Sequence, residues 1–327
     1  MKKASGVDGV TIEQFEQNLS RNLFKLWNRM SSGSYFPPAV KAVEIPKAGG
    51  KGVRVLGVPS VSDRIAQTVT AMYLERRVEP VSHPDSYGYR PRRSALDAVE
   101  TCRRRCWRSN WVVDLDIRAF FDSVDHELML RAIERHVDDA DGKWVLLYVK
   151  RWLVAPLAKP DGTVQQRERG TPQGSAISPV LANLYLHYAF DMWLVREFPQ
   201  VTFERYCDDA VIHCRSEYQA RRVRDALAAR LAQVGLELHP DKTRVVYCKD
   251  ADWRGSFEHT SFTFLGYTFR PRLAKNRYVH ARLRAPGERA FARLKSWRIL
   301  RRARCSTNRI SRIVGAVHTL LTCSYPG

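Results

Sequence analysis

Apolar residues recur at two different spacings along the chain, which predicts a protein that mixes helices with strands. From about Thr11 to Met30 they recur at helical spacing, and Asp63 to Val78 and Ser94 to Trp107 read as helices in the same way. Val40 to Ile45 and Val53 to Val58 read instead as a strand pair, joined by a basic, glycine-rich turn. This alternation favours the α+β or α/β class.

An alternating segment, Trp111 to Ile117, carries two acids. As a strand it would place Asp114 and Asp116 on one face and the apolar residues on the other. A buried acid is costly unless it is paired or holds a metal, whereas an edge strand facing solvent would carry it freely. From this segment alone, both interpretations stay open.

A second acidic segment lies between two β-like runs, Thr202 to Tyr206 and Ala210 to Cys214. Cys207, Asp208 and Asp209 join the two runs tightly, as in a hairpin. Adjacent aspartates at a turn often only satisfy turn backbone groups or face water. Magnesium, however, prefers oxygen ligands and is commonly held by one or two carboxylates together with substrate phosphates. A strand acid and a hairpin pair brought together would therefore suit two-metal phosphoryl transfer.

The charge of the chain indicates what kind of partner it binds. With 54 Lys and Arg against 34 Asp and Glu, the formal net charge is +20, which favours a polyanion such as nucleic acid. The segment from Arg270 to the end contains 15 basic residues and a single acid, Glu288. A helix is expected there around Ala290 to Arg304. Ribosomal-type basic proteins and membrane-surface proteins share such a charge, so it specifies no chemistry.

The sequence contains no apolar run of roughly 18 residues and no apolar leader at its N-terminus, which predicts a cytoplasmic protein without a membrane partner.

Its seven cysteines are odd in number and form no CxxC pair, so we expect reduced thiols and neither a disulfide framework nor a zinc ribbon. Cys102 and Cys106 lie four apart on an expected helix and could form half a metal site. Without a second pair nearby in the sequence, packing is the favoured interpretation.

Several motifs together resemble those of reverse transcriptases. Three of them are Phe-Phe-Asp shortly after Asp116, the segment Thr171 to Pro179, and the tetrapeptide Tyr206 to Asp209. The closest resemblance is to group II intron-encoded reverse transcriptases. Further blocks in family order are Gly6 to Val10, Ile45 to Lys47, Ser86 to Pro91, His239 to Thr243 and Phe264 to Tyr267. They extend over about four-fifths of the chain.

The resemblance implies an α+β right-hand polymerase fold with fingers, palm and thumb. We expect the fingers at 1–110 and the first part of the palm, with connecting helices, at 111–170. The rest of the palm, with the nucleotide-pocket loop, the hairpin and the primer grip, is expected at 171–280, and a partial basic helical thumb at 281–327. The full maturase and endonuclease regions of group II proteins are not expected here.

The same resemblance implies a catalytic metal triad of Asp116, Asp208 and Asp209. It also implies a backbone carbonyl ligand at Ile117. The expected cofactor is Mg²⁺, as two ions, with Mn²⁺ as a substitute. Asp209 is expected to bind less directly, and Asp114 is expected to be structural.

Substrate contacts follow from the same comparison. The expected nucleotide-binding residues are Lys47, Arg54, Ala119, Phe120, Phe121, Gln173 and Lys242. Phe121 matches a bulky residue under the sugar that would clash with a 2′-hydroxyl, although an aromatic pair without context is usually core. Lys51 competes with Lys47 in the alignment, and Lys242 matches a possible proton donor to pyrophosphate, although such a lysine is usually surface. The expected primer and template contacts are Tyr206, Cys207, Arg90, Leu265, Gly266 and Tyr267.

The implied function is RNA-directed DNA polymerisation of the group II intron type. The partners would be an RNA template, a DNA primer and product, deoxynucleotides, and an intron or other structured RNA. One alternative is a retron-like or phage-defence reverse transcriptase with the same active site. The non-enzymatic alternative is an RNA-binding, maturase-like scaffold.

Overall fold

A computed structural model describes residues 5–46, 52–137, 142–248, 255–273 and 279–284. The chain divides into two compact units. Of the described residues, unit 1 comprises those within 5–80 and 121–181, and unit 2 comprises those within 81–120 and 182–284. Lys47, Lys51 and the expected helix around Ala290 to Arg304 lie outside the described residues, as does most of the expected thumb. The predicted fingers, palm and thumb boundaries stay predictions.

Unit 1 combines helices with a small mixed sheet. Its elements are α1 (Ile12–Gln17), α2 (Leu19–Ser31), β1 (Val40–Pro46), β2 (Val53–Val58), α3 (Val61–Val78), α6 (His126–Glu134), α7 (Lys143–Val154), β4 (Leu157–Ala158) and β5 (Val164–Gln165). Three short elements straddle the unit boundaries: η1 (Glu79–Val81), α5 (Phe120–Ser123) and α8 (Ser178–Leu186). The strands are ordered β2-β1-β4-β5, with β1 antiparallel to β2. The expected strand pair and the expected helix from Asp63 to Val78 are thus confirmed.

The single helix expected over Thr11 to Met30 is wrong in one respect. The segment forms two helices, which meet at Asn18, a residue with φ −124° and ψ 46°, outside the helical region. Thr11 and Gln14 form a capping box that fixes the start of α1. The apolar spacing continues across the break, and for this reason the pattern alone did not reveal it.

Unit 2 is built on an antiparallel sheet. Its remaining elements are α4 (Ala95–Cys106), β3 (Trp111–Leu115), η2 (His187–Asp191), α9 (Met192–Glu197), β6 (Thr202–Tyr206), β7 (Asp209–Cys214), α10 (Glu217–Gln233), β8 (Arg244–Tyr247), β9 (Phe262–Phe264), β10 (Tyr267–Leu273) and β11 (Val279–Arg284). The helix expected from Ser94 to Trp107 is confirmed as α4. Its N-cap Ser94 forms a capping box with Asp97.

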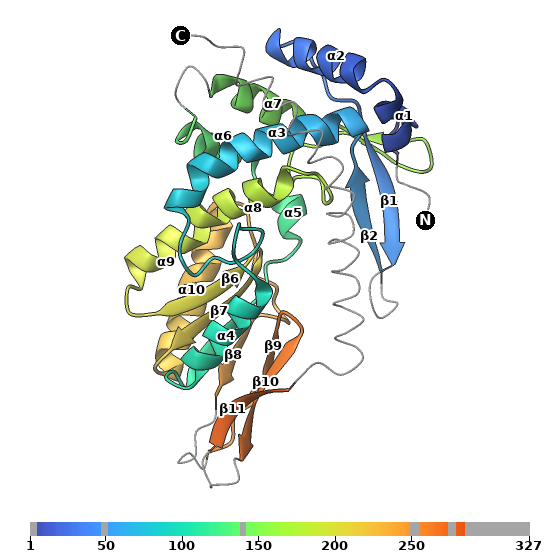
Figure 1. Ribbon diagram of the computed structural model, residues 1–327. Coiled ribbons are helices and arrows are strands. Elements are labelled where there is room, and N and C mark those ends of the chain that lie inside the picture. Colours follow the sequence, from blue (N-terminus) through green and yellow to red (C-terminus); the bar gives the residue numbers. More distant parts are fainter. Residues whose placement is uncertain (1–4, 47–51, 138–141, 249–254, 274–278, 285–327) are drawn as a thin grey trace. The chain divides into compact units, whose positions relative to one another are not determined.

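The sheet at the centre of unit 2 has the strand order β6-β7-β3-β8, and all of its pairs are antiparallel. Figure 1 labels its strands β6, β7 and β8. Helix α4 contacts β6 and β7, while α10 contacts β3, β7 and β8. Val112, Val211 and Val246 pack with the buried side of α4, as the two-residue period of a strand requires. A separate sheet, β11-β10-β9, follows in the chain.

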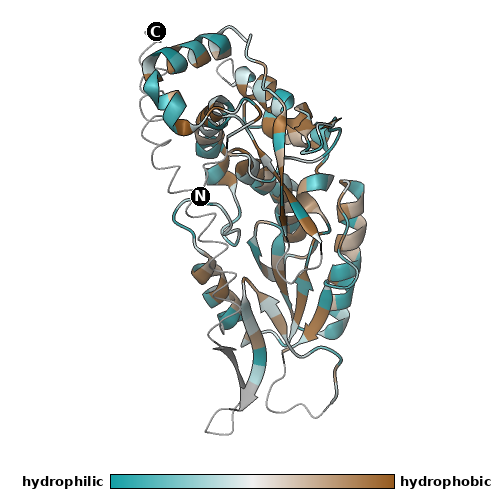
Figure 2. Cartoon of the chain, turned by 90° about the vertical axis from the view of Figure 1, so that its right-hand side faces the viewer, coloured by the Kyte–Doolittle hydropathy of each residue, from teal (hydrophilic) through white to brown (hydrophobic). Residues whose placement is uncertain are grey.

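The cores agree with the amphipathic patterns of the sequence. Several helices carry both hydrophilic and hydrophobic stretches (Figure 2), as expected where one side of a helix is buried. The strands β3 and β7 are mostly buried. Among the helices that the structure describes, none has the length and apolar character needed to span a membrane.

Candidate active site

Asp116 lies directly after β3 in unit 2, and its backbone is held by the segment that directly precedes β8. The Thr243 hydroxyl accepts a hydrogen bond from the Asp116 N–H at 3.3 Å and donates one to the Asp116 carbonyl at 3.2 Å. The His239 N–H donates to the same carbonyl at 2.8 Å. Asp116 is therefore fixed by residues more than 100 positions away, which are part of the motif from His239 to Thr243.

The hairpin of β6 and β7 carries the other two acids. Tyr206 pairs with Asp209, which leaves Cys207 and Asp208 as the two turn residues. Cys207 has φ 60°, the positive value that primed hairpin turns require and that glycine usually supplies. The register of β3 on β7 ends with Leu115 opposite Ala210, so Asp116 and Asp209 lie at the same end of the sheet.

The electrostatics of this sheet end show that carboxylates gather there. Burial raises the pKa of Asp114 to about 7, with contributions from the negative charges of Asp209 and Asp116. The Lys242 ammonium lies 3.1 Å from Asp116 Oδ2 and supplies one positive charge. Hard oxygen donors that repel one another in this way fit a divalent cation. The residues present therefore suit the magnesium ions expected from the sequence.

A buried ion pair between Arg205 and Asp191 stabilises the turn of Cys207 and Asp208. Both Arg205 Nε and Nη2 donate to the Asp191 carboxylate, at 2.7 and 2.6 Å, and both side chains are almost wholly buried. Arg205 Nη1 also donates to the Cys207 carbonyl at 3.0 Å and to Asn183 Oδ1 at 3.2 Å. The guanidinium thus ties the turn to α8 and η2. Sequence reasoning missed this role; the available signal was a pair of charged residues, Glu204 and Arg205, within a segment that reads as a strand.

The loop from Ser86 to Pro91 approaches the same turn. A methyl group built on Gly88 would come within 2.9 Å of the Tyr206 carbonyl carbon and closer still to the Cys207 nitrogen. The Gly88 carbonyl accepts a hydrogen bond from Asn183 Nδ2 at 2.6 Å. Arg90, expected at primer or template, donates to the His83 and Ser86 carbonyls at 2.6 and 2.8 Å. In the structure, the Arg90 side chain therefore stabilises the loop to which it belongs.

Part of the expected nucleotide pocket lies in unit 1. The Thr171 N–H donates to the Phe121 carbonyl at 2.7 Å, and the Gly57 N–H donates to the Gln173 carbonyl at 2.8 Å. These bonds connect the turn of Phe121, the loop of Gln173 and strand β2, which also carries the exposed Arg54. Three of the expected residues are therefore held in one compact unit.

The remaining predicted residues are distributed around unit 2. Ala119, with φ 44°, and the buried Phe120 follow Asp116 and Ile117. The expected primer grip is a two-residue turn between β9 and β10, in which Leu265 and Gly266 have φ 51° and 85°. This pair of positive φ values is the signature of a type I′ hairpin turn. The glycine turn predicted there is thus present, with Tyr267 beginning β10.

Most of the chain matches the model of a known protein family. Residues 45–269 match the model described as reverse transcriptase (RNA-dependent DNA polymerase). The chain belongs to the reverse transcriptase family. Members of this family use divalent metal ions for nucleotidyl transfer, in agreement with the carboxylates described above.

Two curated relatives illustrate how this reverse transcriptase compares with others. It is 31% identical over 317 residues to Protein YkfC of Escherichia coli (strain K12), covering 85% of this chain and 78% of the relative. It is 27% identical over 252 residues to the group II intron-encoded protein LtrA of Lactococcus lactis subsp. cremoris, covering 74% of this chain and 40% of that protein. The resemblance to group II intron reverse transcriptases is thereby confirmed.

Solved structures of telomerase share the fold. Telomerase from Candida albicans, in complex with a fragment of telomeric RNA, superposes with a TM-score of 0.57 at 14% identity, over 78% of this chain and 48% of that chain. Apo telomerase from Candida tropicalis gives a TM-score of 0.55 at 14% identity, over 77% of this chain and 51% of that one. The right-hand polymerase fold expected from the sequence is thus confirmed.

Proposed function

We propose that this reverse transcriptase extends a DNA primer along an RNA template with deoxynucleotides, in the manner of group II intron enzymes. The observation that carries the proposal is the placement of Asp116 and Asp209 at one end of the β3–β7 pair, with Asp208 in the adjoining turn. An end of a sheet that gathers acids, in a chain with a net charge of +20, suits metal-assisted chemistry on a polyanion.

Asp116, Asp208 and Asp209 would hold two Mg²⁺ ions, with the Ile117 carbonyl as a further ligand and Mn²⁺ as a substitute. When bound, the ions would activate the primer 3′-hydroxyl and neutralise charge on the triphosphate. Thr243 keeps Asp116 in position through its two backbone hydrogen bonds. Lys242 balances the Asp116 charge in the structure and is the candidate proton donor to departing pyrophosphate.

For the nucleotide we keep the residue roles that the family resemblance implies. Phe121 would exclude a 2′-hydroxyl, Gln173 would line the sugar pocket, and Arg54, with Lys47 as a candidate, would neutralise the triphosphate. The backbone N–H groups of Ala119 and Phe120 would face the phosphates, a role that needs no particular side chain.

Primer extension tests this proposal directly. The wild-type protein and Asp208→Ala are compared on RNA and DNA templates, each with deoxynucleotides and with ribonucleotides. We expect the wild type to extend on RNA with deoxynucleotides and the variant to lose this activity. Equal extension by both proteins would show that Asp208 has no role. A wild type that binds RNA without extending any primer would favour the scaffold function.

The biological template is a separate question. Intron proteins are among the relatives of this chain, and this supports an intron or another structured RNA as the partner. Sequencing the RNA that co-purifies with the protein distinguishes the possibilities. Enrichment of one intron supports the group II type, whereas a short non-coding RNA from a different locus would support the retron-like or phage-defence alternative.

A further inference from the structure

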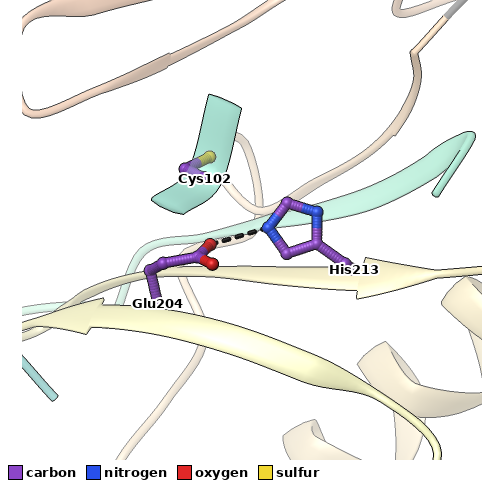
Figure 3. Close-up of side chains that lie close together, drawn as sticks. All are labelled: Cys102, Glu204 and His213. Carbon is purple, nitrogen blue, oxygen red and sulfur yellow. Dashed lines mark hydrogen bonds and ion pairs between the residues drawn. The ribbon is translucent and has the colours of Figure 1, made fainter. Parts of the chain in front are cut away.

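Three side chains with metal-binding chemistry meet in unit 2, on the side of the sheet that α4 covers. Cys102 comes from α4, Glu204 from β6 and His213 from β7, and their side chains converge (Figure 3). One potential ligand atom from each of the three lies within 4.8 Å of those of the other two. Cys102, which precedes Glu204 by 102 positions, is thus brought next to the hairpin of Glu204 and His213, which the sequence pattern could not show.

The three side chains are almost entirely shielded from solvent. Cys102 and Glu204 are 0% exposed and His213 is 2% exposed. Glu204 Oε2 lies 2.6 Å from His213 Nε2, while Glu204 Oε1 accepts a hydrogen bond from Arg105 Nη1 at 2.6 Å. His213 Nδ1 is buried without a hydrogen-bond partner. Deep burial of such polar groups is costly unless something compensates for it.

Two more thiols belong to the same neighbourhood. Cys106 follows Cys102 by one helical turn, and the two thiols interact with each other. Cys106 also interacts with Cys248, whose N–H donates to the Asn110 carbonyl at 2.7 Å. The Cys106 thiol also interacts with the His213 ring and contributes to raising its pKa. The helical pair that the sequence offered as half a site therefore has partners from the sheet.

The donor set has a clear chemical preference. Thiolate sulfur and imidazole nitrogen with one carboxylate oxygen suit Zn²⁺ or a similar transition ion, whereas Mg²⁺ and Ca²⁺ prefer oxygen ligands alone. Without a cation, burial raises the pKa of Cys102 to about 11, which keeps its thiol protonated. A simple ion pair of Glu204 with Arg105 and His213 explains the carboxylate, but it leaves the gathering of thiols unexplained.

We propose that unit 2 contains a buried structural site for Zn²⁺ or a similar thiophilic ion, held by Cys102 Sγ, Glu204 Oε2 and His213 Nε2. Cys106 is the candidate fourth ligand. Binding releases the proton of each ligating thiol and the proton that Glu204 and His213 share, and no oxidant or reductant is needed. Arg105 remains paired with Glu204 Oε1 and fixes the orientation of the carboxylate, as outer-shell partners commonly do.

The position of the site gives it a structural purpose. Glu204 and His213 lie on the two strands of the hairpin that carries Asp208 and Asp209, and Cys102 lies on the helix packed against them. An ion there would cross-link α4, β6 and β7. The inference concerns the stability of this layer and holds whether or not the protein polymerises DNA.

The test uses the reduced 327-residue protein and Co²⁺ as a spectroscopic substitute for Zn²⁺. We expect about one equivalent of Co²⁺ to produce thiolate-to-metal charge-transfer absorption together with the intense visible bands of tetrahedral coordination. Added Zn²⁺ should abolish both signals. Cys102→Ser and His213→Gln should each weaken binding by about 100-fold or more, because removal even of an outer-shell partner costs about 10–100-fold.

Cys214→Ser is the matched control, since Cys214 is a buried thiol on β7 whose raised pKa is caused by burial alone. It should bind Co²⁺ as the wild type does. Asp208→Asn, tested in the same way, separates this site from the candidate magnesium site and should also retain the thiolate signal. A folded, reduced wild type without thiolate-to-cobalt absorption would overturn the proposal, even if the Cys102 and His213 variants failed to fold.

Discussion

Asp116 shows how a single carboxylate is prepared for its proposed role. Its backbone is held by Thr243 and His239, and its side chain faces Lys242 at 3.1 Å. These contacts fix the carboxylate before any cation binds, which lowers the reorganisation that binding would require. Burial raises the pKa of the neighbouring Asp114 to about 7, and its structural role stays a prediction.

Phe121 provides a test at the same scale. If its ring excludes the 2′-hydroxyl, then Phe121→Ala should raise the use of ribonucleotides relative to deoxynucleotides by at least about tenfold, which corresponds to about 1.4 kcal/mol. Single-nucleotide incorporation on one template measures the ratio. Phe121→Tyr keeps the ring and should keep the discrimination. An unchanged ratio in the alanine variant would leave Phe121 as a packing residue.

At the scale of elements, the loop that carries Gly88 sets the position of the Cys207 turn. Gly88→Ala would push a methyl group against the backbone of Tyr206 and Cys207, neither of which can give way as a flexible side chain would. We expect primer extension to fall at least about tenfold, since small displacements of reacting groups are costly. Far-UV circular dichroism should stay close to that of the wild type.

Gly162→Ala serves as a control for this prediction. Gly162 has a positive φ, of 84°, which Gly88 does not have, and no atom lies within 4 Å of a methyl group built at Gly162. Gly162→Ala therefore adds backbone strain but no contact with the hairpin, and primer extension should stay close to that of the wild type. Normal activity in Gly88→Ala would show that the loop and the turn can separate freely.

A buried acid in unit 1 supplies a stability prediction. Asp63 Oδ1 accepts hydrogen bonds from the Tyr35 hydroxyl at 2.7 Å and from Trp152 Nε1 at 3.2 Å. Asp63→Ala leaves both donors buried without a partner and should lower the free energy of unfolding by about 2–5 kcal/mol. Asp63→Asn keeps an acceptor oxygen and should cost less. Urea unfolding followed by tryptophan fluorescence measures the difference.

The raised pKa of Asp63 predicts that the free energy of unfolding depends on pH. Burial raises the pKa of Asp63 above its ordinary value, although hydrogen bonds from Tyr35, Trp152 and Ser60 oppose the shift. Because the folded-state pKa exceeds the unfolded-state pKa, ionisation destabilises the fold. This loss of folding free energy is absent at low pH. It grows as the pH rises from the unfolded-state pKa to the folded-state pKa and is complete above it. Asp63→Asn should remove this component; identical pH profiles of unfolding for wild type and variant would contradict it.

The elements themselves were predictable to the extent that their patterns are local. The β1–β2 pair, α3, α4 and the β6–β7 hairpin follow from apolar spacing and turn residues. The break at Asn18 did not follow, because the apolar spacing continues through it. The Arg205–Asp191 pair and the Cys102–Glu204–His213 group were also out of reach. Both depend on contacts between segments that only the tertiary fold brings together.

At the scale of the whole molecule, charge and chemistry have separate origins. The net charge of +20 supplies attraction for nucleic acid that does not depend on base sequence. The acids at the end of the β3–β7 pair oppose that attraction, so a protein that only bound RNA would gain nothing from them. The proposed metal-assisted chemistry would account for them, and this proposal could already be made from the motifs in the sequence.

The most direct test of this account measures binding and extension on the same samples of wild type and Asp116→Asn, with one labelled primer on an RNA template. Asparagine removes the charge and preserves the shape, so binding should be as tight as in the wild type or tighter, while extension with deoxynucleotides and Mg²⁺ should be lost. Undiminished extension by Asp116→Asn would contradict the proposed active site.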